Sequence, residues 1–325
     1  MRIAVLTVDG MFDSGLTTVL DVLAAANVFR GDGPGAPPPF EVTVVGPTDH
    51  IRTGHGLRLA TTAMAELEIR PDLVISPAVG LRGPGEVVDI VRSHPAIAWL
   101  GARAEDGSAL AAACSGTFFL GEAGLLDDKI ATTSWWLGAA FRSRYPSVRL
   151  DERLTIAEQD RVTTAGAAFA HIDLALSVVA GQSPELAERV SRHLLIGARP
   201  SQAAFAIPTQ LAGVDPVVKA FERWVRDHLD EPLRIRRVAG EIGLSERALQ
   251  RATAAVLGMS PLDFVHEIRL DQATHLLRTT HQTPESVAHA VGYQNVSTLR
   301  SLVRRRRGTT LTELAHGHRR EERAC

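Results

Sequence analysis

A cysteine in the first half of the chain stands where a fold could expose a nucleophile. Cys114 follows a run of small residues from Ser108 to Ala113 that is predicted to be a strand, and it precedes a helix that continues through Glu122. This placement matches the nucleophile elbow, in which a strained turn between strand and helix presents a side chain over the end of a sheet. Because the positive end of the helix would lie beside the thiol, we expect it to favour the thiolate.

A cysteine nucleophile also needs a base, and the sequence offers none in a suitable place. The base must accept the thiol proton, and it must be held in position by a third group. Asp13, in the loop before the first helix, could supply an acid, but Cys114 is followed by Ser115 and no His-x-Glu triplet lies downstream. His171, in another loop, could equally cap a helix or form a hydrogen bond in the core. We therefore do not expect catalysis at Cys114.

The same residues could instead line a pocket for a small molecule. Open α/β sheets bind ligands at the carboxyl ends of their strands, and the candidate lining residues are Asp13, Cys114, Ser115, Trp135 and His171. Each also has a purely structural interpretation, with Cys114 as a small buried side chain, Trp135 as core and Asp13 as a helix cap. An effector-sensing pocket and an inert dimerisation scaffold both remain open. We identify no metal-binding or cofactor-binding motif and expect neither group.

The last third of the chain contains one pattern twice. VAGEIGLSERALQR, from Val238 to Arg251, returns as VAHAVGYQNVSTLR, from Val287 to Arg300. The copies align at an offset of 49 residues up to Gly243 and Gly292, and at an offset of 50 beyond them. Each copy is two short helical segments separated by a glycine, which is typical of a helix-turn-helix. Two such units in tandem, rich in arginine, indicate binding to double-stranded DNA.

Polar side chains on the second helical segment of each unit are the candidate DNA contacts. Arginine and glutamine can form paired hydrogen bonds with guanine and adenine edges, and hydroxyl groups can reach phosphates. In the first unit these residues are Ser245, Glu246, Arg247, Gln250 and Arg251. In the second unit they are Gln294, Asn295, Ser297, Thr298, Arg300 and Ser301. The run from Arg304 through Arg305 to Arg307 is expected to neutralise phosphate charge.

The elements that must position these residues differ between the two halves of the chain. In the first half, strands are predicted at residues 3–8, 40–45, 73–76, 108–113, 129–133 and 161–164. Helices are predicted between or after them at residues 16–24, 86–93, 96–104, 117–122, 168–180 and 184–195. This alternation is typical of a doubly wound, mainly parallel α/β sheet, as in flavodoxin-like folds.

Every element predicted after residue 215 is a helix. The helices lie at residues 217–229, 235–242, 245–257, 261–277, 284–291 and 296–306. Asp215-Pro216 is a good cap and first turn for the first of them. The helix at 261–277 would be a rigid spacer that holds two recognition helices about one DNA turn, roughly 34 Å, apart, and its expected core positions are Ile268, Ala273, Leu276 and Leu277. We expect domains at 1–195 and 216–325, with a linker at 196–215.

The charge of the chain divides in the same way. Residues 1–215 carry a net charge of −7 and residues 216–325 carry +5, within a total of −2. An acidic half joined to a basic half is typical of a regulatory or catalytic module attached to a nucleic-acid-binding one. Two cysteines, Cys114 and Cys325, allow no disulfide framework and fit a reducing cytosol. The apolar run at the N-terminus is too short for a signal peptide or a membrane span, so we expect a cytoplasmic protein.

Four strings in the C-terminal half occur in a familiar order. They are Ser245-x-Arg247-x-Leu249-x-Arg251, Gly258-x-Ser260-Pro261, Arg269-Leu270-x-x-Ala273-x-x-Leu276-Leu277 and Val287-Ala288-x-x-Val291-Gly292-Tyr293. This half resembles the AraC/XylS family, which implies a seven-helix, all-α domain whose two helix-turn-helix units enter successive major grooves. The chain departs from the family pattern where Thr253 and Leu299 replace phenylalanines, and at Arg307 and Thr309-Thr310.

The first half carries a resemblance of its own. The residues that carry it are Ala112-Ala113-Cys114-Ser115-Gly116, Gly124-Leu125-Leu126-Asp127 and Ala131-Thr132-Thr133. It resembles the PfpI-type class I glutamine amidotransferase-like domain, and the whole chain resembles GlxA-type regulators, which join such a domain to an AraC module. PfpI-type peptidases have histidine at the position of Ser115, and the GlxA-like pattern often has histidine at Ser134. The resemblance therefore implies a catalytically degenerate domain.

Together these patterns lead us to expect a transcriptional regulator. Its expected partners are double-stranded promoter DNA, a second copy of the chain, a small-molecule effector of the first domain and, if it activates, RNA polymerase; no membrane partner is expected. Two alternatives stay open. The first is a cysteine-dependent amidase or peptidase with an accessory DNA-binding tail, and the second is a redox sensor that acts through Cys114.

Overall fold

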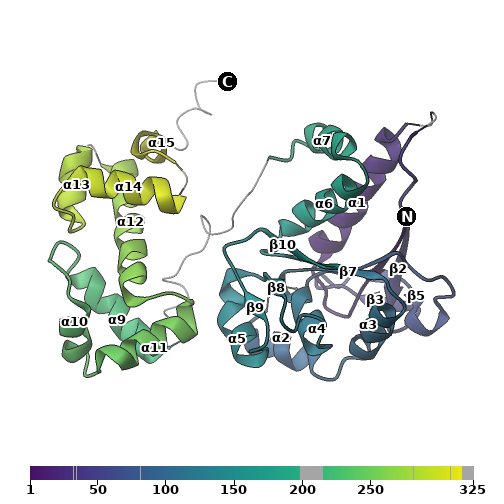
Figure 1. The fold of residues 1–325 in the computed structure, drawn as a ribbon, viewed down its shortest axis with the longest axis horizontal. Coiled ribbons are helices and arrows are strands. Elements are labelled where there is room, and N and C mark those ends of the chain that lie inside the picture. Colours follow the sequence, from purple (N-terminus) through teal and green to yellow (C-terminus); the bar gives the residue numbers. More distant parts are fainter. Residues whose placement is uncertain are drawn as a thin grey trace. The chain divides into compact units, whose positions relative to one another are not determined.

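A computed structural model divides the chain into two compact units, residues 1–202 and 203–325 (Figure 1). The structure describes residues 1–31, 33, 35–80, 82–197, 215–280, 282–307 and 309–316, and only the backbone of 315 and 316. Most of the predicted linker at 196–215 lies outside the described residues, as does Cys325. Each unit has a hydrophobic core of its own.

The first unit is built around a seven-stranded sheet in the order β10-β11-β7-β6-β1-β2-β5. Its strands are β1 (Arg2–Leu6), β2 (Glu41–Gly46), β5 (Thr62–Ala63), β6 (Leu73–Ser76), β7 (Ala109–Ala113), β10 (Ile156–Gln159) and β11 (Val162–Ala165). Neighbouring strands are parallel except β10 and β11. The central strands β1, β6 and β7 are buried almost throughout, which is why their sequences are continuously apolar rather than alternating.

Helices cover both faces of this sheet. One group of helices packs together on one face: α1 (Asp13–Phe29), α6 (Ala170–Gln182) and α7 (Pro184–His193). A second group lies on the opposite face: α2 (Pro84–Val91), α3 (Ala96–Glu105) and α4 (Thr117–Glu122). Two packed layers around one sheet are the doubly wound arrangement predicted from the alternating elements. That prediction is confirmed.

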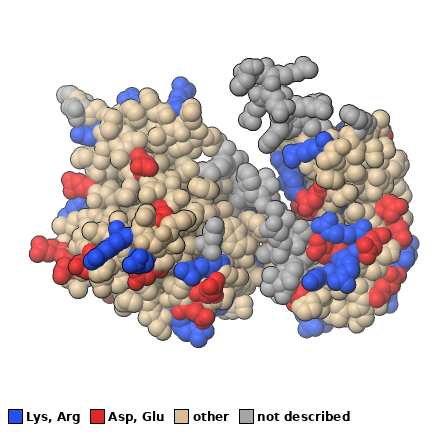
Figure 2. All heavy atoms as spheres, turned by 180° about the vertical axis from the view of Figure 1, so that it is seen from behind, with Lys and Arg blue, Asp and Glu red and all other residues tan. Residues whose placement is uncertain are grey.

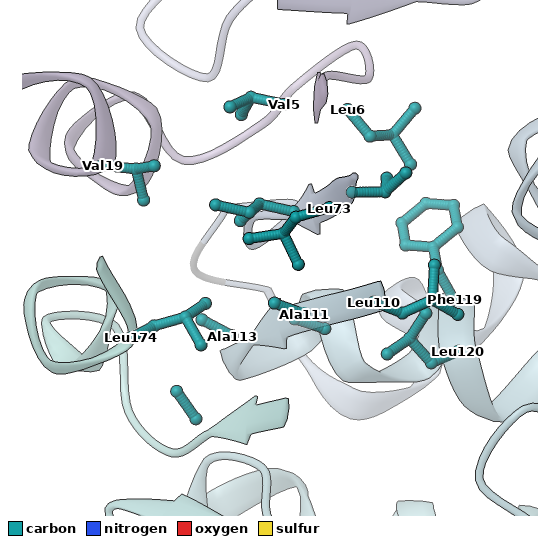
Figure 3. Packing of buried hydrophobic residues seen from close by; sticks show 14 of the residues in the cluster. Val5, Leu6, Val19, Leu73, Leu110, Ala111, Ala113, Phe119, Leu120 and Leu174 are labelled. Carbon is teal, nitrogen blue, oxygen red and sulfur yellow. The ribbon is translucent and has the colours of Figure 1, made fainter. Parts of the chain in front are cut away.

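The hydrophobic core of the first unit lies between these layers. Figure 3 shows Val19 of α1 and Leu174 of α6 approaching the sheet from one side, and Phe119 and Leu120 of α4 approaching it from the other. Ala111 of β7 lies between them, and all five residues are at most 1% exposed. The small side chains of β7 allow both helical layers to approach this strand closely. The strand leads directly to Cys114, so the core fixes the position of the cysteine turn.

Several short elements of the first unit are absent from the prediction. They are the two edge strands of the main sheet, β5 and β10, together with β3 (His50–Arg52), β4 (Arg58–Ala60), β9 (Arg149–Leu150) and α5 (Gly138–Arg144). The strand predicted at 129–133 is reduced to β8 (Ile130–Ala131), which pairs with β9 and does not join the main sheet. The chain leaves the strand at Thr132 and Thr133, whose hydroxyls donate to the carbonyls of Leu154 at 2.9 Å and Cys114 at 2.7 Å.

The described part of the second unit forms seven helices. They are α9 (Pro216–Asp227), α10 (Ile235–Glu241), α11 (Glu246–Leu257), α12 (Pro261–Thr279), α13 (Pro284–Ala290), α14 (Val296–Arg307) and α15 (Leu311–His316). Asp215 caps α9, because its Oδ1 accepts hydrogen bonds from the backbone N–H groups of Val217 and Val218 at 2.8 and 3.0 Å. The predicted cap is confirmed, and the described part of this half is all-α. Among its described helices, α15 is the one that the residue pattern did not predict.

Two hydrophobic clusters, one in each half of this unit, are joined along α12. Phe264 and Ile268 of α12 belong to the first cluster, while Leu270 and Ala273 belong to the second. Of the four predicted core positions of this helix, Ile268 and Ala273 are fully buried, and Leu276 and Leu277 pack partly buried at its end. No helix in the described part of the chain is long and apolar enough to cross a membrane.

Candidate functional site

The first helix-turn-helix consists of α10, a turn at Gly243 and α11. Gly243 has a φ of 77°, a left-handed conformation that glycine adopts without strain and that reverses the chain between the helices. Ser245 caps α11, because its hydroxyl accepts a hydrogen bond from the Ala248 N–H at 3.2 Å. Leu249 is buried in the core. The predicted contacts are all exposed, namely Ser245, Glu246, Arg247, Gln250 and Arg251.

The second helix-turn-helix repeats this geometry with one extra residue in its turn. Gly292 has a φ of 78°, and Asn295 Oδ1 accepts from the Thr298 N–H at 2.9 Å, as Ser245 does for α11. The extra residue lies between Gly292 and Asn295, which explains the change of offset in the repeat. The same oxygen also accepts from the hydroxyls of Ser297 and Thr298, so these bonds do not engage the side-chain NH2 group of Asn295. The predicted contacts of this unit are also exposed: Gln294, Asn295, Ser297, Thr298, Arg300 and Ser301.

The arginine run at the end of α14 divides into two pairs. Arg304 and Arg305 are exposed. Arg306 and Arg307 point toward α12, where their Nη atoms lie 2.9 and 2.7 Å from the carboxylate of Glu267. The cluster is completed by two further carboxylates of α12, those of Asp263 and Asp271. The side chains of Arg306 and Arg307 are only 20% and 12% exposed. The expectation that the whole run faces phosphates is therefore wrong for this second pair.

A hollow of about 410 Å³ lies between α12 and α14. It is lined by His266, Ser297, Thr298, Ser301, Leu302 and Arg305. Burial lowers the pKa of His266, and the neighbouring arginines lower it further, so the ring is neutral at neutral pH.

On the face seen in Figure 2, arginines and acidic side chains of the second unit lie close together. This is expected where some arginines bind carboxylates and others face solvent.

In the first unit, the turn at Cys114 has the geometry of an elbow. Cys114 has a φ of 56° and lies in a 3-10 turn, Cys114–Gly116, between β7 and α4. Gly116 approaches the end of β6 so closely that a Cβ atom there would lie 2.3 Å from the Ser76 carbonyl oxygen. The hydroxyl of Ser115 accepts a hydrogen bond from the Val79 N–H at 3.0 Å, which ties the turn to the loop after β6. The predicted strand–turn–helix placement is confirmed.

The thiol of Cys114 is enclosed by neighbouring side chains. The residue is 1% exposed, and the Ser134 hydroxyl donates a hydrogen bond to Sγ at 2.8 Å. Burial raises the pKa of the Cys114 thiol and outweighs the hydrogen bonds from Ser134 and Ser115, which favour the thiolate. The start of the helix does favour the thiolate, through the backbone N–H of Ser115, but desolvation is the larger effect and raises the pKa of the thiol overall.

His171 is a buried structural group. Its Nε2 accepts a hydrogen bond from the Ala78 N–H at 3.2 Å, and its Nδ1 donates to the Ala168 carbonyl oxygen. Burial lowers the pKa of His171 to about 4, although the bond to Ala168 opposes this shift. Neither ring nitrogen is free to accept a proton from another group. Of the two interpretations of His171, the core hydrogen bond agrees with the structure.

A histidine that no sequence motif singled out lies against the predicted acid. His55 lies in the loop between β3 and β4, and its Nδ1 is 2.9 Å from Asp13 Oδ2. Burial opposes ionisation of Asp13, but hydrogen bonds from Thr53 and His55 together outweigh burial and hold the pKa of this carboxyl below its usual value. Asp13 Oδ1 is buried without a hydrogen-bond partner among the described residues. No spacing rule could link the two residues, because they are 42 positions apart and meet only when the hairpin folds over the sheet edge.

Aromatic side chains border the same edge. The ring of Phe12 lies 6.1 Å from that of Phe169, which is 56% exposed. Trp135 is half-buried and packs against Trp136. The structure thus brings Cys114, Ser115 and His171 together around the carboxyl ends of β6 and β7. Of the other two predicted pocket residues, Asp13 contacts His55 and Trp135 packs against Trp136.

Comparison with known protein families agrees with both halves of this description. The model described as "DJ-1/PfpI family" matches residues 1–181, more than half of the chain. The chain belongs to the DJ-1/PfpI family. A second model, described as "Helix-turn-helix domain", matches residues 238–317, which contain both α11 and α14. The resemblance stated from the sequence, a PfpI-type domain followed by an AraC-type helix-turn-helix domain, is confirmed.

Relatives of this DJ-1/PfpI protein carry names that agree with the second domain. It is 32% identical over 210 residues to the HTH-type transcriptional regulator CdhR of Pseudomonas aeruginosa, a match that covers 62% of this chain and 61% of CdhR. It is 28% identical over 237 residues to GbdR, an HTH-type transcriptional regulator of the same species, covering 70% of this chain and 64% of GbdR. The match therefore spans less than two thirds of either relative.

A solved structure of another regulator has a fold similar to part of this chain. The crystal structure of an AraC family transcriptional regulator from Pseudomonas putida is 26% identical to this chain, with a TM-score of 0.50. The match covers 59% of this chain and 98% of that one.

Proposed function

We propose that this DJ-1/PfpI family member is a sequence-specific transcriptional regulator that binds promoter DNA through both helix-turn-helix units. The observation that carries the proposal is the pair of capped helices α11 and α14, each with a buried apolar side and an exposed polar side. Relatives named as HTH-type transcriptional regulators support it.

The exposed side chains have distinct roles in this proposal. On α11, Arg247, Gln250 and Arg251 are the groups that would read base edges, because arginine and glutamine fit the major-groove edges of guanine and adenine. Arg300 and Ser301 occupy the corresponding side of α14. The remaining polar contacts would hold the DNA backbone: Ser245, Gln294, Asn295, Ser297, Thr298, Arg304 and Arg305. Glu246 has a carboxylate that only accepts hydrogen bonds, so it would face the amino group of a cytosine rather than a phosphate.

For the DJ-1/PfpI domain we propose a regulatory role, through a small-molecule effector, through dimerisation, or through both. The loops after β1, β6 and β7 meet at the carboxyl edge of the sheet, where open α/β folds bind ligands. Asp13 offers a carboxylate oxygen without a partner among the described residues, beside the exposed His55. We further propose a cytoplasmic homodimer that contacts RNA polymerase if it activates transcription.

We propose that Cys114 is not a catalytic nucleophile. Its thiol is buried and has a raised pKa, and the group that donates a hydrogen bond to it is the hydroxyl of Ser134 rather than an imidazole. His171 already uses both ring nitrogens. The alternative, a cysteine-dependent amidase or peptidase, has the elbow conformation in its favour, but the elbow without a base would not activate the thiol.

Electrophoretic mobility shift with duplexes selected by the protein tests the DNA-binding proposal. Replacing Arg247 or Arg251 with alanine should weaken specific binding by about 1–3 kcal/mol if either side chain reads a base. Arg223→Ala, which removes an exposed arginine of α9, is the matched control for charge and should have little effect. Affinity should also fall steeply with salt. If both α11 variants bind like the control, the base-reading role of α11 is refuted.

A further inference from the structure

Arg269, in the middle of α12, donates hydrogen bonds to two backbone segments: the loop that leads into the first helix-turn-helix, and the turn of the second. Its Nη2 donates to the Glu231 carbonyl oxygen at 2.7 Å, in the loop between α9 and α10. Its Nη1 donates to the Gly292 carbonyl oxygen at 3.1 Å, in the turn of the second unit. The guanidinium carbon lies 5.3 Å from the centre of the Tyr293 ring, next to that turn. One side chain therefore joins the spacer helix, a loop of the first unit and the turn of the second.

The turn of the second helix-turn-helix also touches the loop between α9 and α10 directly at this point. Gly292 is packed so closely that a Cβ atom there would lie 2.2 Å from the Leu229 carbonyl oxygen. Leu229 and Glu231 belong to the same loop of the first unit, so this loop receives both the second turn and the Arg269 bond. The two helix-turn-helix segments are thus connected by more than the spacer α12, because the turn at Gly292 packs on the loop between α9 and α10.

The chemistry of this contact favours a geometric role for Arg269. The residue is 6% exposed, and burial lowers the pKa of its guanidinium, so the charge is held in an unfavourable place. Its hydrogen-bond acceptors are two backbone carbonyls and not carboxylates. These bonds therefore constrain the position of the backbone and do not neutralise the charge. A planar guanidinium can donate in two fixed directions at once, whereas the ammonium of lysine is a point charge on a flexible stem.

We propose that Arg269 is a positioning residue that fixes the distance and orientation between the recognition helices α11 and α14. Two such helices must meet successive major grooves about one helical turn apart. If the second helix-turn-helix could pivot about α12, it would lose that conformational freedom on binding DNA. The entropy lost would lower the affinity for a site of defined spacing. The consequence for DNA rests on the proposed function, whereas the positioning is a property of the free protein.

Pulsed electron paramagnetic resonance on the full-length protein tests the positioning without DNA. Spin labels are placed at Gln250→Cys on α11 and Ser301→Cys on α14, both exposed, in a Cys325→Ala background and with labelled chains diluted in unlabelled protein. We expect one narrow distance distribution in this parent, and a broadened or shifted distribution when Arg269→Gln is added. An unchanged distribution in Arg269→Gln overturns the proposal.

Three further variants guard against a trivial result. Arg269→Lys keeps the charge but loses the two-direction fork, so it should also broaden the distribution. Arg278→Gln is the matched control, because Arg278 lies on the same helix and donates to the Leu314 carbonyl in α15, and it should leave the distribution unchanged. Gly292→Ala places a Cβ atom against the Leu229 carbonyl oxygen, so it pushes the turn away from the α9–α10 loop and should shift the distance distribution. Circular dichroism melting of each variant establishes that it is folded, and if Arg269→Gln does not fold, the lysine and alanine variants decide.

Duplexes with altered half-site spacing separate this proposal from the proposed function. On the duplex selected by the unlabelled wild-type protein, the single variant Arg269→Gln should lose about tenfold in affinity, equivalent to about 1.4 kcal/mol, and should discriminate less against duplexes lengthened by one base pair. Wild-type affinity and spacing preference in Arg269→Gln overturn the proposal. If the wild-type protein binds no duplex specifically, the proposed function fails, and the resonance result still decides the role of Arg269.

Discussion

Burial governs the ionisable side chains near Cys114. The thiol pKa is raised, and the pKa of His171 is lowered to about 4, both mainly because the charged forms lose solvent. Both groups are therefore uncharged at neutral pH, which removes the thiolate–imidazolium pair of an activated cysteine. The φ of 56° at Cys114 persists because Gly116 and Ser115 lock the turn against the loop after β6. Packing thus holds the elbow in its conformation.

Stability should depend on pH through His171. Its folded pKa of about 4 lies below the unfolded value, so between these values the unfolded chain binds a proton that the native chain does not. The free energy of unfolding of the first unit should therefore fall as pH drops below about 6.5, by up to about 1.4 kcal/mol per pH unit, until about pH 4. Urea unfolding at pH 7, 6 and 5 measures this slope.

The matched variant for that measurement is His171→Asn, which keeps a donor toward the Ala168 carbonyl but does not titrate. It should be less stable than the wild type at pH 7, and the difference should shrink as pH falls. Parallel pH profiles for the two proteins would show that His171 takes up its proton in the native state, which is incompatible with a folded pKa of about 4.

Cys114 should react slowly with iodoacetamide in the native protein. In a Cys325→Ala background, a buried thiol with a raised pKa offers both little access and little thiolate. Each unit by which the pKa rises removes about tenfold in thiolate at neutral pH, so native alkylation should be at least about tenfold slower than alkylation in urea. Mass spectrometry of timed samples measures both rates, and equal rates would favour the enzyme or redox alternatives.

At the scale of elements, α12 organises the second unit. Apolar side chains from different sides of this helix contribute to the two hydrophobic clusters, and its acidic residues hold the end of α14. Glu267 is central, because its two oxygens contact Arg306 and Arg307 while its side chain is only 8% exposed. The orientation of the second recognition helix therefore depends on a buried charge cluster as well as on apolar packing.

Replacing Glu267 should destabilise the second unit much more than replacing an exposed partner. Glu267→Ala leaves two half-buried guanidinium groups short of a carboxylate, which costs about 3 kcal/mol in comparable sites. The control is Glu285→Ala, which removes a 3.6 Å pair with Arg300 in which both side chains are 58% exposed, and it should cost at most about 1 kcal/mol. Thermal unfolding of both variants gives the comparison, and equal losses would contradict the role assigned to Glu267.

Local patterns predicted elements better than partners. The helices at 217–229, 245–257 and 261–277 lie within two residues of α9, α11 and α12 at each end, because their apolar periodicity and capping residues are local signals. The partners of Arg306 and Arg307 lie 36 to 43 residues away, and the run alone predicts exposed charge. The hairpin that carries His55 to Asp13 is too short to show periodicity, so that contact could not be predicted either.

At the scale of the whole molecule, two units with separate cores carry opposite charge. The excess of acidic residues lies in the half that contains the DJ-1/PfpI domain, and the excess of arginine lies in the half that contains both helix-turn-helix units. Such a division suits a chain in which one part approaches the DNA polyanion and the other does not. The central claim is that both helix-turn-helix units read DNA together, at a spacing fixed within the second unit.

Selection of random duplexes by the full-length protein tests this claim most directly. We expect enriched sequences with two conserved motifs whose centres lie about one helical turn, roughly 10–10.5 base pairs, apart. Arg247→Ala should relax the sequence of one motif, and Arg300→Ala should relax that of the other, because the two residues lie on different recognition helices. A selection that enriches no sequence, or a single motif that neither substitution alters, would contradict the claim.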